Sequence, residues 1–292
     1  MAETCPQWQQ ILPPAWPPAQ RERLTELGLY PRLRFKLYER RWYQQAILFL
    51  DRWLLDSQLV YMILRKRFFA EQVRVEIEKG AEQVVILGAG IDPAGIQYAT
   101  AYPQVQVWEI DRADLLSSEY DLQRPDNLHR ITTDLTQPRW YQTLTNQLDW
   151  RCDVPTVFMA EGLLMYLTEK AVRSLFRSLK QLSPEQGSLY FGYLRSTASG
   201  RPSYGRHSWL VRLGLWCVGE PLLWSLNPEQ LDVFLQSEGL TSTLAPDETN
   251  LHRRFLRETH HGDRFPPPSI EFMADARWGQ GSTDAASRSR LS

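Results

Sequence analysis

An apolar, β-branched run that ends in glycine is the feature that most constrains how this chain can fold. Residues 84–88 read VVILG, and AGID follows at once. A short run of this kind is typical of a parallel strand buried on both faces. Gly88 and Gly90, with Ala89 between them, allow the backbone to approach a ligand closely, and the amides of the next helix face the same space. The junction therefore predicts an α/β sheet with a ligand at the carboxyl end of this strand.

Strand-like and helix-like runs alternate through the middle of the chain, as they do in βαβ units. The predicted strands are Val84–Gly88, Val105–Asp111, Arg130–Thr133, Pro155–Gly162 and Ser188–Leu194, and the predicted helices are Pro93–Tyr102, Trp140–Leu148 and Thr168–Leu182. Because helices join the consecutive strands, we expect a doubly wound, mostly parallel α/β sheet with helices on both faces.

The flanking segments complete a single expected domain over residues 1–292. Its expected parts are a helical segment at 1–75, a ligand-binding core at 76–194, a cap at 195–227, the C-terminal part of the sheet at 228–277 and a disordered tail at 278–292. Long insertions such as the cap usually cover a pocket. The C-terminal part should hold a helix at Pro228–Ser237, ended by Gly239, and strands at Leu240–Leu244 and Ile270–Ala274.

The composition is that of an ordinary globular protein, with 43% apolar residues, 23% charged residues and a formal net charge of -1. Nothing in this balance points to a nucleic-acid partner. Cys5, Cys152 and Cys217 lack CxxC spacing, which argues against a disulfide framework and a zinc site, so no metal is expected. A signal-peptide pattern and an apolar run of about 18 residues are also missing. We therefore expect a cytoplasmic protein that does not contact membranes.

Acidic residues stand at the ends of the next two predicted strands. Glu109 and Asp111 close the second strand, about 20 positions after the glycines, where doubly wound folds place an acid that binds ribose hydroxyls. Asp134 follows the third strand and precedes Leu135, so the carboxylate can accept from an adenine amino group while the leucine packs on the ring. These residues predict a site for an adenosine-type nucleoside.

Glu161 follows an almost wholly apolar predicted strand, in MAEGLLMYL. A charge at the rim of a pocket is costly without a cationic or donating partner. That partner could be an ammonium group of the ligand or a substrate proton. Tyr166, close by in the sequence, is expected to line the same pocket.

Four short motifs resemble those of the leucine carboxyl methyltransferase family. They are GAGID at residues 88–92, EID at 109–111, the DL pair at 134–135 and AEGLLMYL at 160–167. The family includes enzymes that methylate the C-terminal leucine of protein phosphatase catalytic subunits, and bacterial relatives that act on polyketides or other small carboxylates and hydroxyls. The resemblance covers roughly residues 65–194. It implies a seven-stranded, Rossmann-like class I methyltransferase sheet, S-adenosyl-L-methionine as cofactor, and an O-methyltransferase activity.

The resemblance also implies a role for each motif residue. The expected cofactor ligands are Gly88, Ala89, Gly90 and Glu161 at the methionine part, Asp111 at the ribose, and Asp134 and Leu135 at the adenine. Upstream, Arg65 in LRKRFF matches a family arginine that binds the cofactor carboxylate, with Arg67 as the second match. A guanidinium suits this role because it bonds a carboxylate with two donors and stays charged when partly buried.

Two residues depart from the family pattern after GAGID. Family members usually continue with a threonine and, a few residues later, an arginine, whereas this chain has Pro93 and Gln97. The departures leave open the finer shape of the methionine end of the site, and with it the strength of catalysis.

The expected acceptor is a carboxylate on a small molecule or at a peptide C-terminus. A carboxylate is ionised near neutral pH and needs no general base. A hydroxyl acceptor would need one, and His207 in the cap is the only histidine placed for that role. No other catalytic residue is identified. Arginines of the cap could pair with an anionic acceptor: Arg195, Arg201, Arg206 and Arg212.

Two other functions stay open at this point. The first is a protein that binds S-adenosylmethionine without turnover, for which the residues after GAGID leave room. The second is an NAD-dependent oxidoreductase, which is disfavoured because Pro93 replaces the third glycine of the dinucleotide motif.

Overall fold

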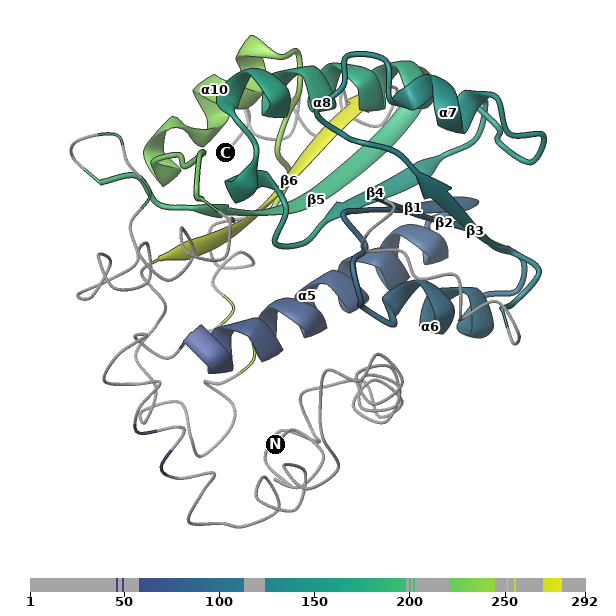
Figure 1. Cartoon of the computed structure of the whole chain (residues 1–292), viewed down its shortest axis with the longest axis horizontal. Helices are drawn as coiled ribbons and strands as arrows, with labels where there is room; N and C mark the ends of the chain where they lie inside the picture. Colours follow the sequence, from purple (N-terminus) through teal and green to yellow (C-terminus); the bar gives the residue numbers. More distant parts are fainter. Residues whose placement is uncertain are drawn as a thin grey trace, which may run out of the picture.

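The computed structural model describes residues 46, 49, 58–112, 124–197, 200, 202, 221–244, 251, 255 and 270–279. They form one six-stranded sheet with helices on both faces (Figure 1). Within this part of the chain, no helix is both long and apolar enough to cross a bilayer.

The sheet has the strand order β3-β2-β1-β4-β5-β6. Its strands are β1 (Gln83–Leu87), β2 (Gln106–Asp111), β3 (Leu128–Thr132), β4 (Thr156–Ala160), β5 (Gln186–Leu194) and β6 (Glu271–Gly279). The first five run parallel, and β6 pairs antiparallel with β5 from Gln186↔Gly279 to Leu194↔Glu271. The predicted doubly wound, mostly parallel α/β sheet is thereby confirmed.

The described residues form six strands, and the expected seventh is reduced to one bridge. In the segment predicted as a strand at Leu240–Leu244, only Thr241 pairs with β6, through Arg277. The amides of Thr243 and Leu244 donate instead to the buried carboxylate of Asp275, over 3.0–3.2 Å. Because these donors bind a side chain, they cannot continue a backbone ladder.

Two groups of helices cover the sheet (Figure 1). Helices α5 (Gln58–Glu78) and α6 (Ala94–Ala101) lie on one face, and α7 (Tyr141–Thr145), α8 (Glu169–Leu182) and α10 (Leu231–Ser237) lie on the other. Two short 3-10 turns, η2 (Leu164–Tyr166) and η3 (Pro228–Gln230), precede α8 and α10. The helices predicted at Pro93–Tyr102, Trp140–Leu148, Thr168–Leu182 and Pro228–Ser237 therefore form. Of these, α7 and α10 are clearly shorter than predicted.

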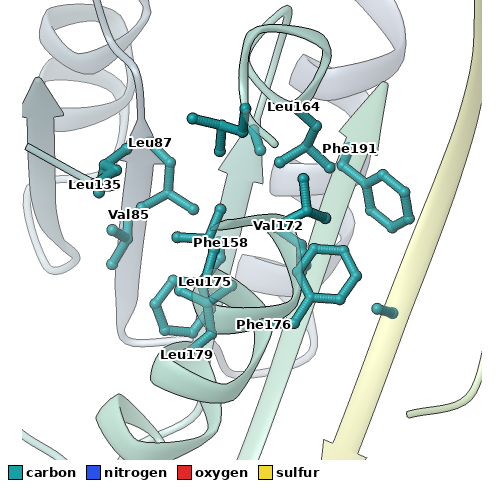
Figure 2. Close-up of a cluster of buried hydrophobic side chains, with 14 of the residues drawn as sticks. Val85, Leu87, Leu135, Phe158, Leu164, Val172, Leu175, Phe176, Leu179 and Phe191 are labelled. Carbon is teal, nitrogen blue, oxygen red and sulfur yellow. The ribbon is translucent and has the colours of Figure 1, made fainter. Parts of the chain in front are cut away.

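Alternation along the strands divides the core into two layers. In β1, Val85 and Leu87 pack beneath α8, whereas Val84 and Ile86 pack beneath α5. Figure 2 shows the first layer, with Leu175, Phe176 and Leu179 of α8 against Phe158 and Phe191 of the sheet. A strand that is apolar on both sides fits only between two helical layers, which explains the unbroken VVIL run.

Several expectations fall on residues outside the described ranges. Most of the N-terminal helical segment and most of the cap belong to this group, as do His207, Arg201, Arg206 and Arg212. The expected tail is described only as far as Gly279, the last residue of β6.

Candidate functional site

The turn after β1 is held open by glycines and fastened to β2. Gly88 and Gly90 have φ angles of 68° and 54°, in the left-handed region that favours glycine. The amides of Gly88 and Ala89 both donate to the carbonyl of Ile110, at 2.8 and 3.3 Å. A Cβ at Gly88 would lie 2.9 Å from Leu163 Cδ1, so the turn also packs against the segment after β4. The turn predicted from the sequence forms at the carboxyl ends of β1, β2 and β4.

Asp111, the last residue of β2, lies directly against this turn. Its Oδ2 accepts from the amide of Gly90 at 2.6 Å, and its Oδ1 accepts from the amide of Arg112 at 2.7 Å. The predicted ribose ligand and the predicted glycine turn are therefore in contact. A carboxylate has about four acceptor positions, so two remain for ligand hydroxyls.

Asp134 and Leu135 follow β3 at the same edge of the sheet. The Asp134 carboxylate accepts from the hydroxyl and the amide of Thr136, at 2.7 and 2.9 Å, and these bonds lower its pKa. Leu135 is buried in the core layer that contains Leu87 (Figure 2). Contact of this pair with an adenine ring stays a prediction.

A cluster of five charged side chains occupies the other side of the turn. Arg65 Nε donates to Glu161 Oε1 at 2.9 Å, and Arg65 Nη1 donates to both oxygens of Glu271 at 2.9 and 3.0 Å. Lys66 Nζ lies 2.8 Å from Glu161 Oε1 and also pairs with Asp92. The cluster joins α5, the turn after β1, the end of β4 and the start of β6.

Acidic partners keep both cations of this cluster charged despite their burial. Burial lowers the pKa of Arg65, but attraction to Glu271 and then Glu161 outweighs it, and the net shift is upward. The pKa of Lys66 is likewise lowered by burial and raised by Asp92 and Glu161, again with a net upward shift. The cluster therefore holds two fixed cations, each paired with acidic side chains, close to the glycine turn.

Two atoms of the cluster keep unused hydrogen-bonding capacity among the described residues. Arg65 Nη2 donates to none of them, and a Cβ placed on Gly162 would lie 3.4 Å from it. Glu161 Oε2 accepts from none of them, because both contacts of this carboxylate are to Oε1. An open cationic donor beside an open anionic acceptor is the complement of an α-amino acid group. The donor set therefore fits the methionine end of the expected cofactor.

Arg67 and Tyr166 lie in different surroundings. The Arg67 guanidinium carbon lies 4.9 Å from the centre of the Phe255 ring, so of the two matched arginines only Arg65 joins the cluster. Tyr166 packs against the small apolar group of Met165, Leu194 and Ile270.

Lys66, Asp92 and Glu271 belong to the cluster but are not among the site residues predicted from the sequence. Lys66 and Asp92 adjoin predicted residues, in LRKRFF and GAGID, so a search for opposite charges around the motifs would have found them. Glu271 lies 206 residues from Arg65 and carries no local signal.

Pro93 and Gln97, the two departures from the family pattern, lie at the start of α6 and within it. Asp92 Oδ1 accepts from the amide of Ala94 at 3.0 Å and so satisfies a free donor at the start of α6, where a proline is tolerated. Gln97 Nε2 is buried and has no partner among the described residues. Beneath α6, Glu109 is fully buried and accepts from Arg130 Nε of β3 at 2.9 Å. The cationic partner of Glu109 is therefore Arg130, a residue of the neighbouring strand β3.

Comparison with known proteins agrees with this geometry. Residues 36–180 match the model of the leucine carboxyl methyltransferase family. "Putative S-adenosyl-L-methionine-dependent methyltransferase YktD" of Bacillus subtilis is 26% identical over 209 residues, which are 68% of each chain. "Putative S-adenosyl-L-methionine-dependent methyltransferase Rv0281" of Mycobacterium tuberculosis is 33% identical over 126 residues, which are 41% of this chain and 40% of that protein.

A crystal structure described as a "putative methyltransferase" from Thermobifida fusca shares the fold. Its TM-score is 0.56 at 14% identity, over 82% of this chain and 89% of that one. The matches favour the methyltransferase interpretation over the NAD-dependent oxidoreductase. By the match over residues 36–180, this chain belongs to the leucine carboxyl methyltransferase family and is an S-adenosyl-L-methionine-dependent methyltransferase.

Proposed function

We propose that this chain methylates an oxygen atom of a carboxylate, on a small molecule or at a peptide C-terminus. The observation that carries the cofactor assignment is the open pair of Arg65 Nη2 and Glu161 Oε2 beside the glycine turn. In this proposal Arg65 binds the cofactor carboxylate and Glu161 binds its ammonium group. Each contact pairs opposite charges at a site with little solvent.

The remaining sequence-predicted residues take their roles from the same edge of the sheet. Asp111 binds the ribose hydroxyls with the acceptor positions that Gly90 and Arg112 leave unused. The backbone of Gly88, Ala89 and Gly90 lies against the methionine part, because the left-handed glycines bring it close. Asp134 accepts from the adenine amino group, with Leu135 below it.

The bound cofactor supplies an electrophilic methyl group on a sulfonium whose leaving group is a neutral thioether. The chain then has to align the acceptor oxygen with that methyl group and exclude water. An ionised carboxylate needs no proton transfer for this reaction. His129, the one histidine within the described ranges, stacks on Trp108 at 4.1 Å near the amino ends of β2 and β3, away from the turn. Carboxylate methylation is therefore consistent with the residues found at the described part of the site.

A test uses the full chain, S-adenosylmethionine with a labelled methyl group, and matched pairs of carboxylic and hydroxyl acceptors. A methyl ester releases volatile labelled methanol in mild base, whereas a methyl ether does not. We expect base-labile product from carboxylic acceptors. Base-stable product from hydroxyl acceptors alone would contradict carboxylate specificity, and cofactor binding without any transfer would support the non-catalytic alternative.

A further inference from the structure

Glu271 reaches the cofactor site from a strand that the motifs do not include. It is the first residue of β6, is 2% exposed, and accepts from Arg65 Nη1 with both carboxylate oxygens. Room for it comes from Gly192 on β5, since a Cβ there would lie 2.7 Å from Glu271 Oε1. A side chain larger than glycine at position 192 would therefore displace this buried carboxylate.

The guanidinium of Arg65 has two edges that a carboxylate can bind with two parallel bonds. One edge consists of Nε and Nη2, and the preferred partner of such an edge is a carboxylate that uses both oxygens. Glu161 bonds to Nε alone, with Oε1. Glu271 holds the guanidinium from the opposite end, at Nη1. Two acids therefore share one cation without closing the Nε–Nη2 edge.

The region around Arg65 is buried, which favours closure of the Nε–Nη2 edge if Glu271 is lost. Tyr61 has a buried hydroxyl without a partner among the described residues, and burial, followed by Glu271, raises its pKa. In so little water, a cation that loses one carboxylate is drawn to the remaining one. Glu161 would then bond to Nη2 through Oε2, which would remove both atoms that the amino-acid group needs.

We infer that Glu271 is a positioning residue that keeps Arg65 Nη2 and Glu161 Oε2 open for the amino-acid end of the cofactor. The inference rests on the proposed cofactor contacts and extends them to a residue that touches the cofactor only through Arg65. It requires that loss of Glu271 weakens recognition of the amino-acid group and leaves recognition of the nucleoside unchanged.

Calorimetry with S-adenosylhomocysteine and 5′-methylthioadenosine separates these two effects. Both ligands carry adenosine and an uncharged thioether, and only the first carries the amino-acid group. For Glu271→Gln we expect affinity for S-adenosylhomocysteine to fall about tenfold, as for a lost charged hydrogen bond, and affinity for 5′-methylthioadenosine to stay unchanged. Glu271→Asp keeps the charge but shortens the side chain, should show the same selective loss, and replaces Glu271→Gln if that variant does not fold.

Asp275→Asn is the matched control, since Asp275 is equally buried on β6 and contacts Thr243 and Arg277 instead of the cluster. It should lower the free energy of unfolding without changing the ratio of the two affinities. If Glu271→Gln weakens both ligands equally, weakens neither, or binds S-adenosylhomocysteine more tightly, the inference is wrong while the proposed function stands. If the wild-type chain fails to prefer S-adenosylhomocysteine over 5′-methylthioadenosine, the proposed cofactor contacts fail first.

Discussion

Replacing Glu76 with glutamine tests how α5, the helix that carries Arg65 and Lys66, is fixed to the sheet. The Glu76 carboxylate accepts from Arg277 at 2.8 Å and from the Tyr190 hydroxyl at 2.9 Å, and it lies 3.0 Å from Lys79. Burial alone would raise the pKa of Glu76, but the bonds from Arg277, Lys79 and Tyr190 lower it from 4.5 to about 2. At about 1.4 kcal/mol per pKa unit, ionised Glu76 contributes about 3 kcal/mol.

The sign of the pH dependence follows from the lowered pKa. The contribution is complete above pH 4.5, the value for an unperturbed group, and is lost as the pH falls towards about 2. Urea unfolding of the wild-type and Glu76→Gln chains should therefore differ most near neutral pH, by about 3 kcal/mol, and converge in acid.

Glu78→Gln is a control on the same helix, because Glu78 is 58% exposed and pairs with the exposed Arg74. A pair of this kind contributes about 0–1 kcal/mol. A Glu76→Gln difference that stays constant between pH 6 and pH 3, or that is no larger than that of the control, would refute the role given to the buried carboxylate.

Three further substitutions test other parts of the site. A Cβ at Gly95 would overlap the Glu109 carboxylate, so Gly95→Ala should destabilise the chain by about 1–3 kcal/mol in urea unfolding. Arg130→Met removes the 2.9 Å partner of a fully buried acid and should cost about 3–5 kcal/mol, part of which Glu109→Gln in the same chain should restore. Arg65→Met should weaken binding of S-adenosylhomocysteine by at least about tenfold in calorimetry, with 5′-methylthioadenosine unaffected. Unchanged stability in either of the first two, or equal loss of both ligands in the third, would contradict the account.

The local sequence pattern is sufficient to predict those parts of the fold and site that depend on residues close together in the chain. The VVILGAGID segment specifies a buried strand and a left-handed glycine turn by itself, and both form. Helix α8 follows from its apolar residues at helical spacing, and Thr168 caps it by accepting from the amide of Ala171. Asp111 reaches the turn because the carboxyl ends of adjacent parallel strands meet at one edge of the sheet.

Contacts between distant segments could not be predicted in this way. The partnership of Glu271 with Arg65 depends on how β6 pairs with β5, and an antiparallel register over nine residues has no signature in either strand alone. The segment predicted as a strand at Leu240–Leu244 reads LTSTL, and the amides of Thr243 and Leu244 donate to the side chain of Asp275 instead of to a neighbouring strand. Register and side-chain capture are decided by tertiary packing, which a local pattern does not contain.

A crystal structure of the full chain with S-adenosylhomocysteine would show directly whether Arg65 and Glu161 bind the amino-acid group of the cofactor. We predict that the ligand carboxylate lies about 2.7–3.2 Å from Arg65 Nη2, that its ammonium group lies equally close to Glu161 Oε2, and that its ribose bonds to Asp111. A ligand bound elsewhere, or one whose amino-acid group contacts neither Arg65 nor Glu161, would contradict it.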